Sequence, residues 1–133
     1  MPILRDNAIA MLSSTSGVDL DAAAATETVL YTVPLGSTAI VTHVVIRTLS
    51  ASAASAVVTF GAGGGAADEW RGAQVLSALD GVTKYVVLYN DQGTNGTPEG
   101  GILFAAGTTF AIEITTKHGV AVTATVDVFG YLF

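Results

Sequence analysis

The longest run of β-forming residues in this chain covers residues 38–49, where twelve positions pass without Gly or Pro and β-branched types dominate. This composition predicts one long strand, and Pro34 and Gly36 just before it predict a turn. Strict alternation along a strand divides the side chains between two faces. One face carries Thr38, Ile40, Thr42, Val44, Ile46 and Thr48, and the other carries Ala39, Val41, His43, Val45, Arg47 and Leu49. Because both faces carry large apolar residues, we expect the core to cover one face and another subunit or a large partner to cover the other.

Shorter runs of the same kind predict further strands at residues 28–33, 55–60, 84–89, 109–116 and 120–132. Residues 9–12 and 102–104 are weaker candidates, and residues 74–79 fit either a strand or a short helix. Turn residues separate the runs and no long helical pattern is present, so about eight strands are expected. We therefore predict an all-β fold: a single antiparallel β-sandwich at residues 26–133, jelly-roll-like, with an immunoglobulin-like sandwich as the alternative.

Residues 1–25 follow a different pattern. They contain apolar side chains without the periodicity of a core element, and the Ser, Thr and Gly of residues 13–17 interrupt the short strand that residues 9–12 allow. We expect an N-terminal arm that is mobile in the isolated protein and becomes ordered against a neighbouring subunit or a partner. The apolar residues of this arm are Ile3, Leu4, Ile9, Met11 and Leu12.

Composition and charge narrow the classes of partner. The formal net charge is −6 with only five Lys and Arg, which argues against a nucleic-acid partner and against an anionic membrane surface. No apolar run approaches the roughly 20 residues of a membrane span, and the first residues lack the order of a signal peptide, so we expect synthesis in a cytoplasm. Only 12% of the residues are charged, about half the usual share, which favours a subunit whose surface is largely interface.

The polar residues show no catalytic or metal-binding pattern. The two histidines, His43 and His118, lie far apart, and no serine has the glycine pattern of a nucleophile elbow. The loop carboxylates lack the dense spacing of a calcium loop. The glycines of residues 61–65 are not followed by the Lys of a phosphate-binding loop, so we interpret them as a flexible loop. We therefore expect no enzyme activity, no metal and no cofactor.

Two groups of aromatic residues are candidates for contacts with a partner. Trp70 lies among charged residues after the glycine-rich loop, where it fits a sugar-stacking platform, an interface anchor or a core residue. The last predicted strand places Val122, Ala124, Val126 and Val128 on one face, which suits the interior. Its opposite face turns from polar to aromatic, and we predict an oligomer interface there. The residues of that predicted interface are Phe129, Tyr131, Phe133, Tyr85 and Tyr89.

Two stretches of the chain resemble a known group of proteins. The first is Tyr31-Thr32-Val33-Pro34-Leu35-Gly36, running into Thr38-Ala39-Ile40-Val41-Thr42-His43-Val44-Val45-Ile46. The second comprises Ala105-Ala106-Gly107-Thr108-Thr109-Phe110 and Thr125-Val126-Asp127-Val128-Phe129-Gly130-Tyr131. Together, residues 28–49 and 102–133 resemble small β-sandwich virion proteins of tailed bacteriophages.

The resemblance implies a capsid decoration (cement) protein or a related head-fibre or neck component, usually a homotrimer. It implies a location on the capsid surface of the virion after synthesis in the host cytoplasm, with the major capsid protein as partner of the arm. The alternative is a carbohydrate- or receptor-binding module of a head fibre, neck or tail that uses Trp70 and residues 90–101. A small cupin-like enzyme is a further alternative, which the shortage of histidine disfavours.

Overall fold

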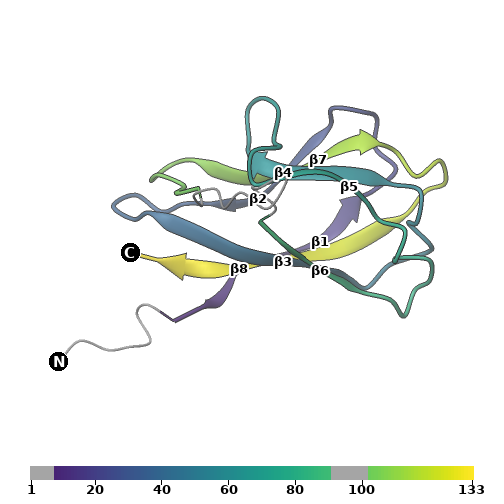
Figure 1. The fold of residues 1–133 in the computed structure, drawn as a ribbon, viewed down its shortest axis with the longest axis horizontal. Helices are drawn as coiled ribbons and strands as arrows, with labels where there is room; N and C mark the ends of the chain where they lie inside the picture. The colour runs from purple at the N-terminus through teal and green to yellow at the C-terminus, as the bar shows by residue number, and fades with distance from the viewer. Residues whose placement is uncertain (1–7, 91–101) are drawn as a thin grey trace, which may run out of the picture.

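The computed structural model describes residues 8–90 and 102–133 as two four-stranded antiparallel sheets packed face to face (Figure 1). The first sheet has the order β1-β8-β3-β6 and the second sheet has the order β2-β7-β4-β5. The strands are β1 Ala10–Asp19, β2 Glu27–Thr32, β3 Ala39–Arg47, β4 Val57–Ala62, β5 Arg71–Val75, β6 Val86–Tyr89, β7 Thr109–Thr116 and β8 Thr123–Leu132. The predicted all-β sandwich is confirmed. No helix that could cross a membrane occurs in the described ranges.

The strand pairing is nested along the chain. β1 pairs with β8, β2 with β7, β3 with β6, and β4 with β5. The pairs β3–β8 and β4–β7 then join these ladders into the two sheets. The jelly-roll form of the sandwich stays a prediction.

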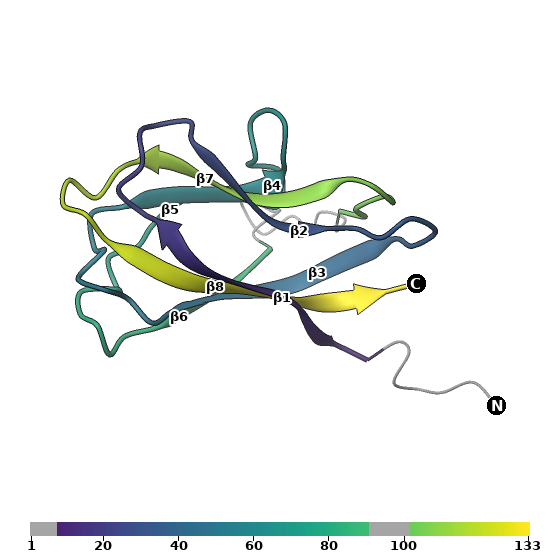
Figure 2. The same ribbon diagram turned by 180° about the vertical axis from the view of Figure 1, so that it is seen from behind.

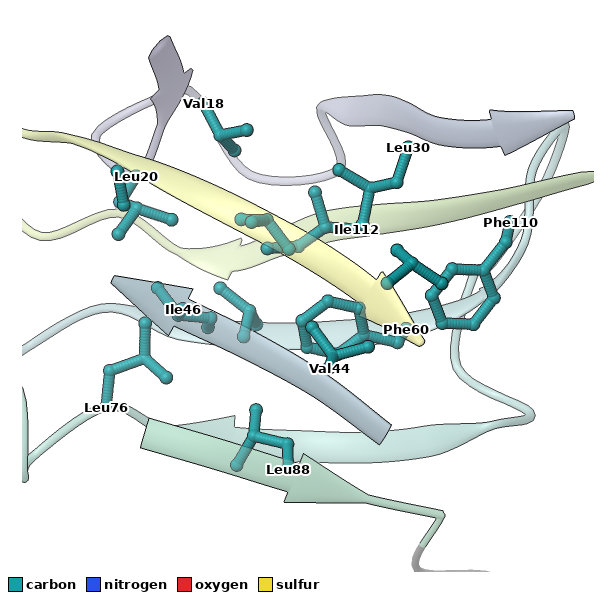
Figure 3. Close-up of a cluster of buried hydrophobic side chains, with 14 of the residues drawn as sticks. Val18, Leu20, Leu30, Val44, Ile46, Phe60, Leu76, Leu88, Phe110 and Ile112 are labelled. Carbon is teal, nitrogen blue, oxygen red and sulfur yellow. The ribbon is translucent and has the colours of Figure 1, made fainter. Parts of the chain in front are cut away.

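The side chains that point between the sheets form one apolar core (Figure 3). β8 alternates as a strand with one buried face should, and it contributes the inner residues that the sequence predicted. Phe60, Phe110 and Ile112 of the second sheet face this layer. The buried residues of β8 are Ala124, Val126 and Val128, and Val122 just before the strand is also buried.

The prediction of an N-terminal arm is wrong for residues 10–19, which form β1. Figure 2 shows β1 lying along β8 at the edge of the first sheet. Residues 13–17 do not end the strand, because the ladder shifts register between Met11 and Ser13 and between Thr15 and Val18, as bulged edge strands do. Val18 and Leu20 are buried in the core. The sandwich therefore begins at β1 rather than at residue 26, while the arm residues Ile3 and Leu4 lie outside the described residues.

The predicted faces of β3 are correct only up to its bulge. The ladder with β8 shifts register between Val41 and His43, which inserts one residue and reverses the alternation. The buried side chains are therefore Ala39, Val41, Val44 and Ile46, drawn from both predicted faces. His43 is turned to the same side as Val45, away from the core.

Two weaker strand predictions resolve differently in the structure. The ambiguous segment at residues 74–79 contributes the end of β5 and then a turn in which Leu76 and Leu79 are buried. Residues 102–104 contribute only an isolated bridge from Phe104 to Ala39.

Candidate interface on the outer face of the first sheet

One row of side chains crosses the outer face of the first sheet on all four strands. Phe129 of β8 lies opposite Met11 of β1 on one side and opposite His43 of β3 on the other. His43 in turn lies opposite Tyr89 of β6. Residues opposite one another in an antiparallel ladder share a face. The row therefore reads Met11, Phe129, His43, Tyr89 from one edge of the sheet to the other.

The aromatic rings in this row are in contact. The His43 imidazole is stacked on the Phe129 ring, with 4.6 Å between centroids and 5° between planes. On its other side, the Tyr89 ring lies 5.9 Å away at a tilt of 40°. The row is only partly covered, since Tyr89 is 60% exposed and Met11 is 54% exposed. An apolar, partly aromatic strip thus faces outward.

A second apolar row continues the strip toward the end of β8. Tyr131 lies opposite Ile40 of β3, and its ring centroid is 6.4 Å from that of Phe133. Two backbone hydrogen bonds to Thr38 hold Phe133 in place beside β3. Its side chain is nevertheless 58% exposed.

The other end of the outer face carries a charged cluster that is internally neutralised. Asp127 of β8 is only 5% exposed. Its carboxylate accepts hydrogen bonds from Arg47 Nε at 2.7 Å and from Ser14 Oγ at 2.6 Å. Burial by itself raises the pKa of Asp127, but the hydrogen bonds from Arg47 and Ser14 and the attraction of the guanidinium outweigh it, so the pKa is lowered. The hydrogen bond to Asp127 and the attraction of its carboxylate raise the pKa of Arg47.

The structure thus brings together most of the interface that the sequence predicted. Phe129, Tyr131 and Tyr89 share the outer face of the first sheet, and Phe133 extends it. Tyr85 lies just before β6 and is 66% exposed. Sequence reasoning placed Tyr89 directly beside the β8 aromatics, whereas His43 separates them. It also assigned Met11 to an arm, because the β1–β8 pairing that places Met11 in the row is not visible in the local pattern.

Trp70 is not part of any surface. Its side chain is fully buried between the sheets, in edge-to-face contact with Phe110 and Phe60. Its indole Nε1–H donates a hydrogen bond of 3.0 Å to the Val41 carbonyl oxygen. The interpretation of Trp70 as a partner or glycan contact is therefore wrong, and its charged sequence neighbours mark a loop that returns into the core.

The second sheet differs from the first because a loop is tied to its outer side. Figure 1 shows the connection between β4 and β5 rising from that side. Glutamate side chains accept hydrogen bonds from backbone N–H groups of this loop: Glu27 from Gly64 and Gly65, and Glu113 from Ala67. The glycine-rich loop, which the sequence predicts to be flexible, is thus tied to β2 and β7.

The described residues contain no cavity and no cluster of three or more residues able to ligate a metal. The outer face of the first sheet is instead a broad surface that can bury apolar area against a partner. Searches against protein-family models and against curated proteins find no match to this chain.

Proposed function

We propose that this protein is a structural, non-enzymatic subunit that assembles with copies of itself through the outer face of the first sheet. The observation that carries the proposal is the aromatic strip Met11, Phe129, His43 and Tyr89, continued by Tyr131 and Phe133, over which no described segment lies. Soluble monomers rarely expose a contiguous apolar patch of more than a few hundred Å².

The size of the strip supports a protein partner rather than a small ligand. A buried aromatic contributes about 150–250 Å². Three side chains of the strip are more than half exposed, at 54–60%, so they and their partly buried neighbours offer on the order of 500 Å² per subunit. Stable interfaces bury about 800 Å² per partner, which this strip approaches once its polar rim is included. At about 25 cal/mol per Å² the apolar part contributes up to about 12 kcal/mol, before association costs of about 4–15 kcal/mol.

The charge distribution favours a second copy as that partner. The chain carries a formal net charge of −6, so two copies repel one another wherever their acidic residues meet. On the outer face of the first sheet, Asp127 is paired with Arg47 at 2.7 Å. When two copies meet through this face, the carboxylate of Asp127 is already neutralised within its own chain. It therefore adds no repulsion between the copies.

We further propose that the assembly is a homotrimer that decorates the outside of a tailed-phage head and contacts the major capsid protein. The support is the resemblance of residues 28–49 and 102–133 to small virion proteins, which falls on β2, β3, β7 and β8. Such a protein stabilises a shell by binding its assembled form, because binding shifts the equilibrium away from dissociated subunits. The burial of Trp70 removes one of the two observations on which the carbohydrate-binding alternative rested. The other is the segment of residues 90–101, of which residues 91–101 lie outside the described residues.

Size-exclusion chromatography with light scattering tests the self-association. At micromolar concentration we expect a species of about 40 kDa, three times the 13.5 kDa of one chain. Phe129→Asp and Tyr131→Asp should each convert it to the monomer, because an unpaired carboxylate would be buried in the contact. Thr115→Asp is the matched control, since it adds the same charge at an exposed position of β7 in the second sheet.

A monomer of the wild-type chain would refute the assembly, and an intact oligomer of both strip variants would place the contact elsewhere.

The virion assignment has a separate test. An antibody against the chain, used in immunogold labelling of tailed-phage particles from the source of the sequence, should decorate the heads. Unlabelled heads, or labelled tails only, would contradict a decoration function.

A further inference from the structure

We infer that His43 makes this assembly sensitive to pH, so that protonation of its imidazole dissociates the oligomer. This inference rests on the proposed self-association through the outer face of the first sheet. It adds that pH regulates that same contact. It comes from the position of His43, which is the only histidine of the strip and lies at its centre, between Phe129 and Tyr89.

The geometry places the imidazole where a contact would remove it from water. His43 is already partly buried, with its ring stacked on Phe129 at 4.6 Å and flanked by Tyr89 at 5.9 Å. A partner that covers these two aromatics must also cover the ring between them. A neutral imidazole is compatible with such a stack, whereas burial of an imidazolium requires a compensating charge or hydrogen bond.

The Thr42 hydroxyl engages one nitrogen of the ring. Its oxygen lies 3.0 Å from His43 Nδ1 and 3.2 Å from the Phe129 carbonyl oxygen. Because the hydroxyl has a single hydrogen, it either donates to the carbonyl oxygen and accepts from Nδ1–H, or donates to Nδ1. In both tautomers the neutral ring keeps one basic nitrogen that can take up a proton.

The charged groups on the neighbouring strands offer the imidazolium no compensation. On β8 and β3 the nearest charges are Asp127 and Arg47, which neutralise each other. From β5 of the second sheet, the Arg71 guanidinium donates to the Tyr89 carbonyl oxygen at 2.7 Å and adds positive charge on that side. β1 contributes Met11 to the row, which carries no charge. Within residues 8–90 and 102–133, protonation of His43 thus adds a charge to the strip without an uncompensated carboxylate to receive it.

Proton linkage sets the size of the effect. Histidine titrates between pH 5 and 8. A contact that admits only the neutral imidazole weakens by up to about tenfold for each pH unit by which the solution lies below the titration range of histidine. Several copies of the strip meet in one oligomer, so the effects multiply and the oligomer should dissociate at micromolar concentration.

The experiment is sedimentation velocity of the full chain at about pH 7.5 and about pH 5, on either side of the histidine range. Far-UV circular dichroism verifies that each sample stays folded. His43→Phe keeps a ring for the stack and removes the titration, and His43→Gln is a second neutral variant in case the first fails to fold. His118→Gln is the control, because it removes the other histidine, which lies in the turn before β8.

We expect the wild type and His118→Gln to be oligomers at about pH 7.5 and to dissociate at about pH 5. The His43 variants should sediment identically at the two pH values. A wild type that stays assembled at the lower pH, or His43 variants that dissociate as the wild type does, would overturn the inference while leaving the assembly standing. A wild type that is monomeric at both pH values would overturn the proposed assembly and this inference with it.

Discussion

Replacement of the single tryptophan tests the core of the sandwich directly. Trp70→Phe keeps an aromatic ring between Phe110 and Phe60 but removes the indole N–H that donates to the Val41 carbonyl oxygen at 3.0 Å. That oxygen belongs to the bulge of β3. Because the indole is fully buried, water cannot take the place of the lost donor.

The expected loss of stability has two parts. An acceptor left unsatisfied in the interior costs about 1–3 kcal/mol. The smaller ring also leaves space equivalent to about two methylene groups, at about 0.8 kcal/mol each. The unfolding free energy should therefore fall by about 3–5 kcal/mol, a large share of the roughly 5–15 kcal/mol of a domain of this kind.

Urea unfolding followed by far-UV circular dichroism measures this change in both chains. Phe110→Leu is the matched control, because it removes ring atoms from the same cluster without removing a hydrogen bond. Before unfolding, the tryptophan emission of the wild type should be blue-shifted and resistant to iodide, because Trp70 is the single tryptophan and is fully buried. A loss below about 1 kcal/mol in Trp70→Phe, or an iodide-accessible tryptophan in the folded chain, would refute the burial of this side chain and the role of its hydrogen bond.

Two further predictions concern the first sheet. Gly130→Ala should destabilise the chain by about 1–3 kcal/mol in urea unfolding, because the added methyl group meets the Ile40 backbone oxygen of the adjacent strand, whereas Gly65→Ala in open space should have little effect; equal stability of the two variants would contradict this packing. The lowered pKa of Asp127 stabilises the fold above about pH 4, where the unfolded carboxyl is ionised, and this contribution is lost as the pH falls through the lower folded pKa. Asp127→Asn should therefore be less stable than the wild type at neutral pH and the difference should shrink toward low pH, while a difference independent of pH would argue against the ion pair with Arg47.

The strands of the sandwich were predictable where alternation is unbroken. In β8 the buried Val126 and Val128 alternate with Phe129 and Tyr131 on the outer face, as the sequence predicts. The same alternation predicted that the aromatic residues at the end of β8 lie on its outer face. Alternation is a property of a few consecutive residues, so no knowledge of the neighbouring strand is needed.

The errors occur where a neighbouring strand decides the outcome. β3 reverses its alternation at a bulge, and only the ladder with β8 shows that His43 shares the outer face with Phe129. β1 looks like an arm because its Ser and Gly residues are poor strand formers, yet pairing with β8 holds them in two bulges. In both segments the pairing partner overrides local propensity.

The sequence by itself determined the class of the fold, the apolar interior of β8 and the aromatic character of its outer face, because each follows from local periodicity and composition. Only the tertiary structure decided that Trp70 lies in the core, that β1 completes the first sheet and that His43 joins the aromatic strip. The physical reason is that these three outcomes depend on contacts between residues far apart in the chain. Trp70 donates to Val41, Met11 pairs with Phe129, and neither partner is identified by its own neighbours in the sequence.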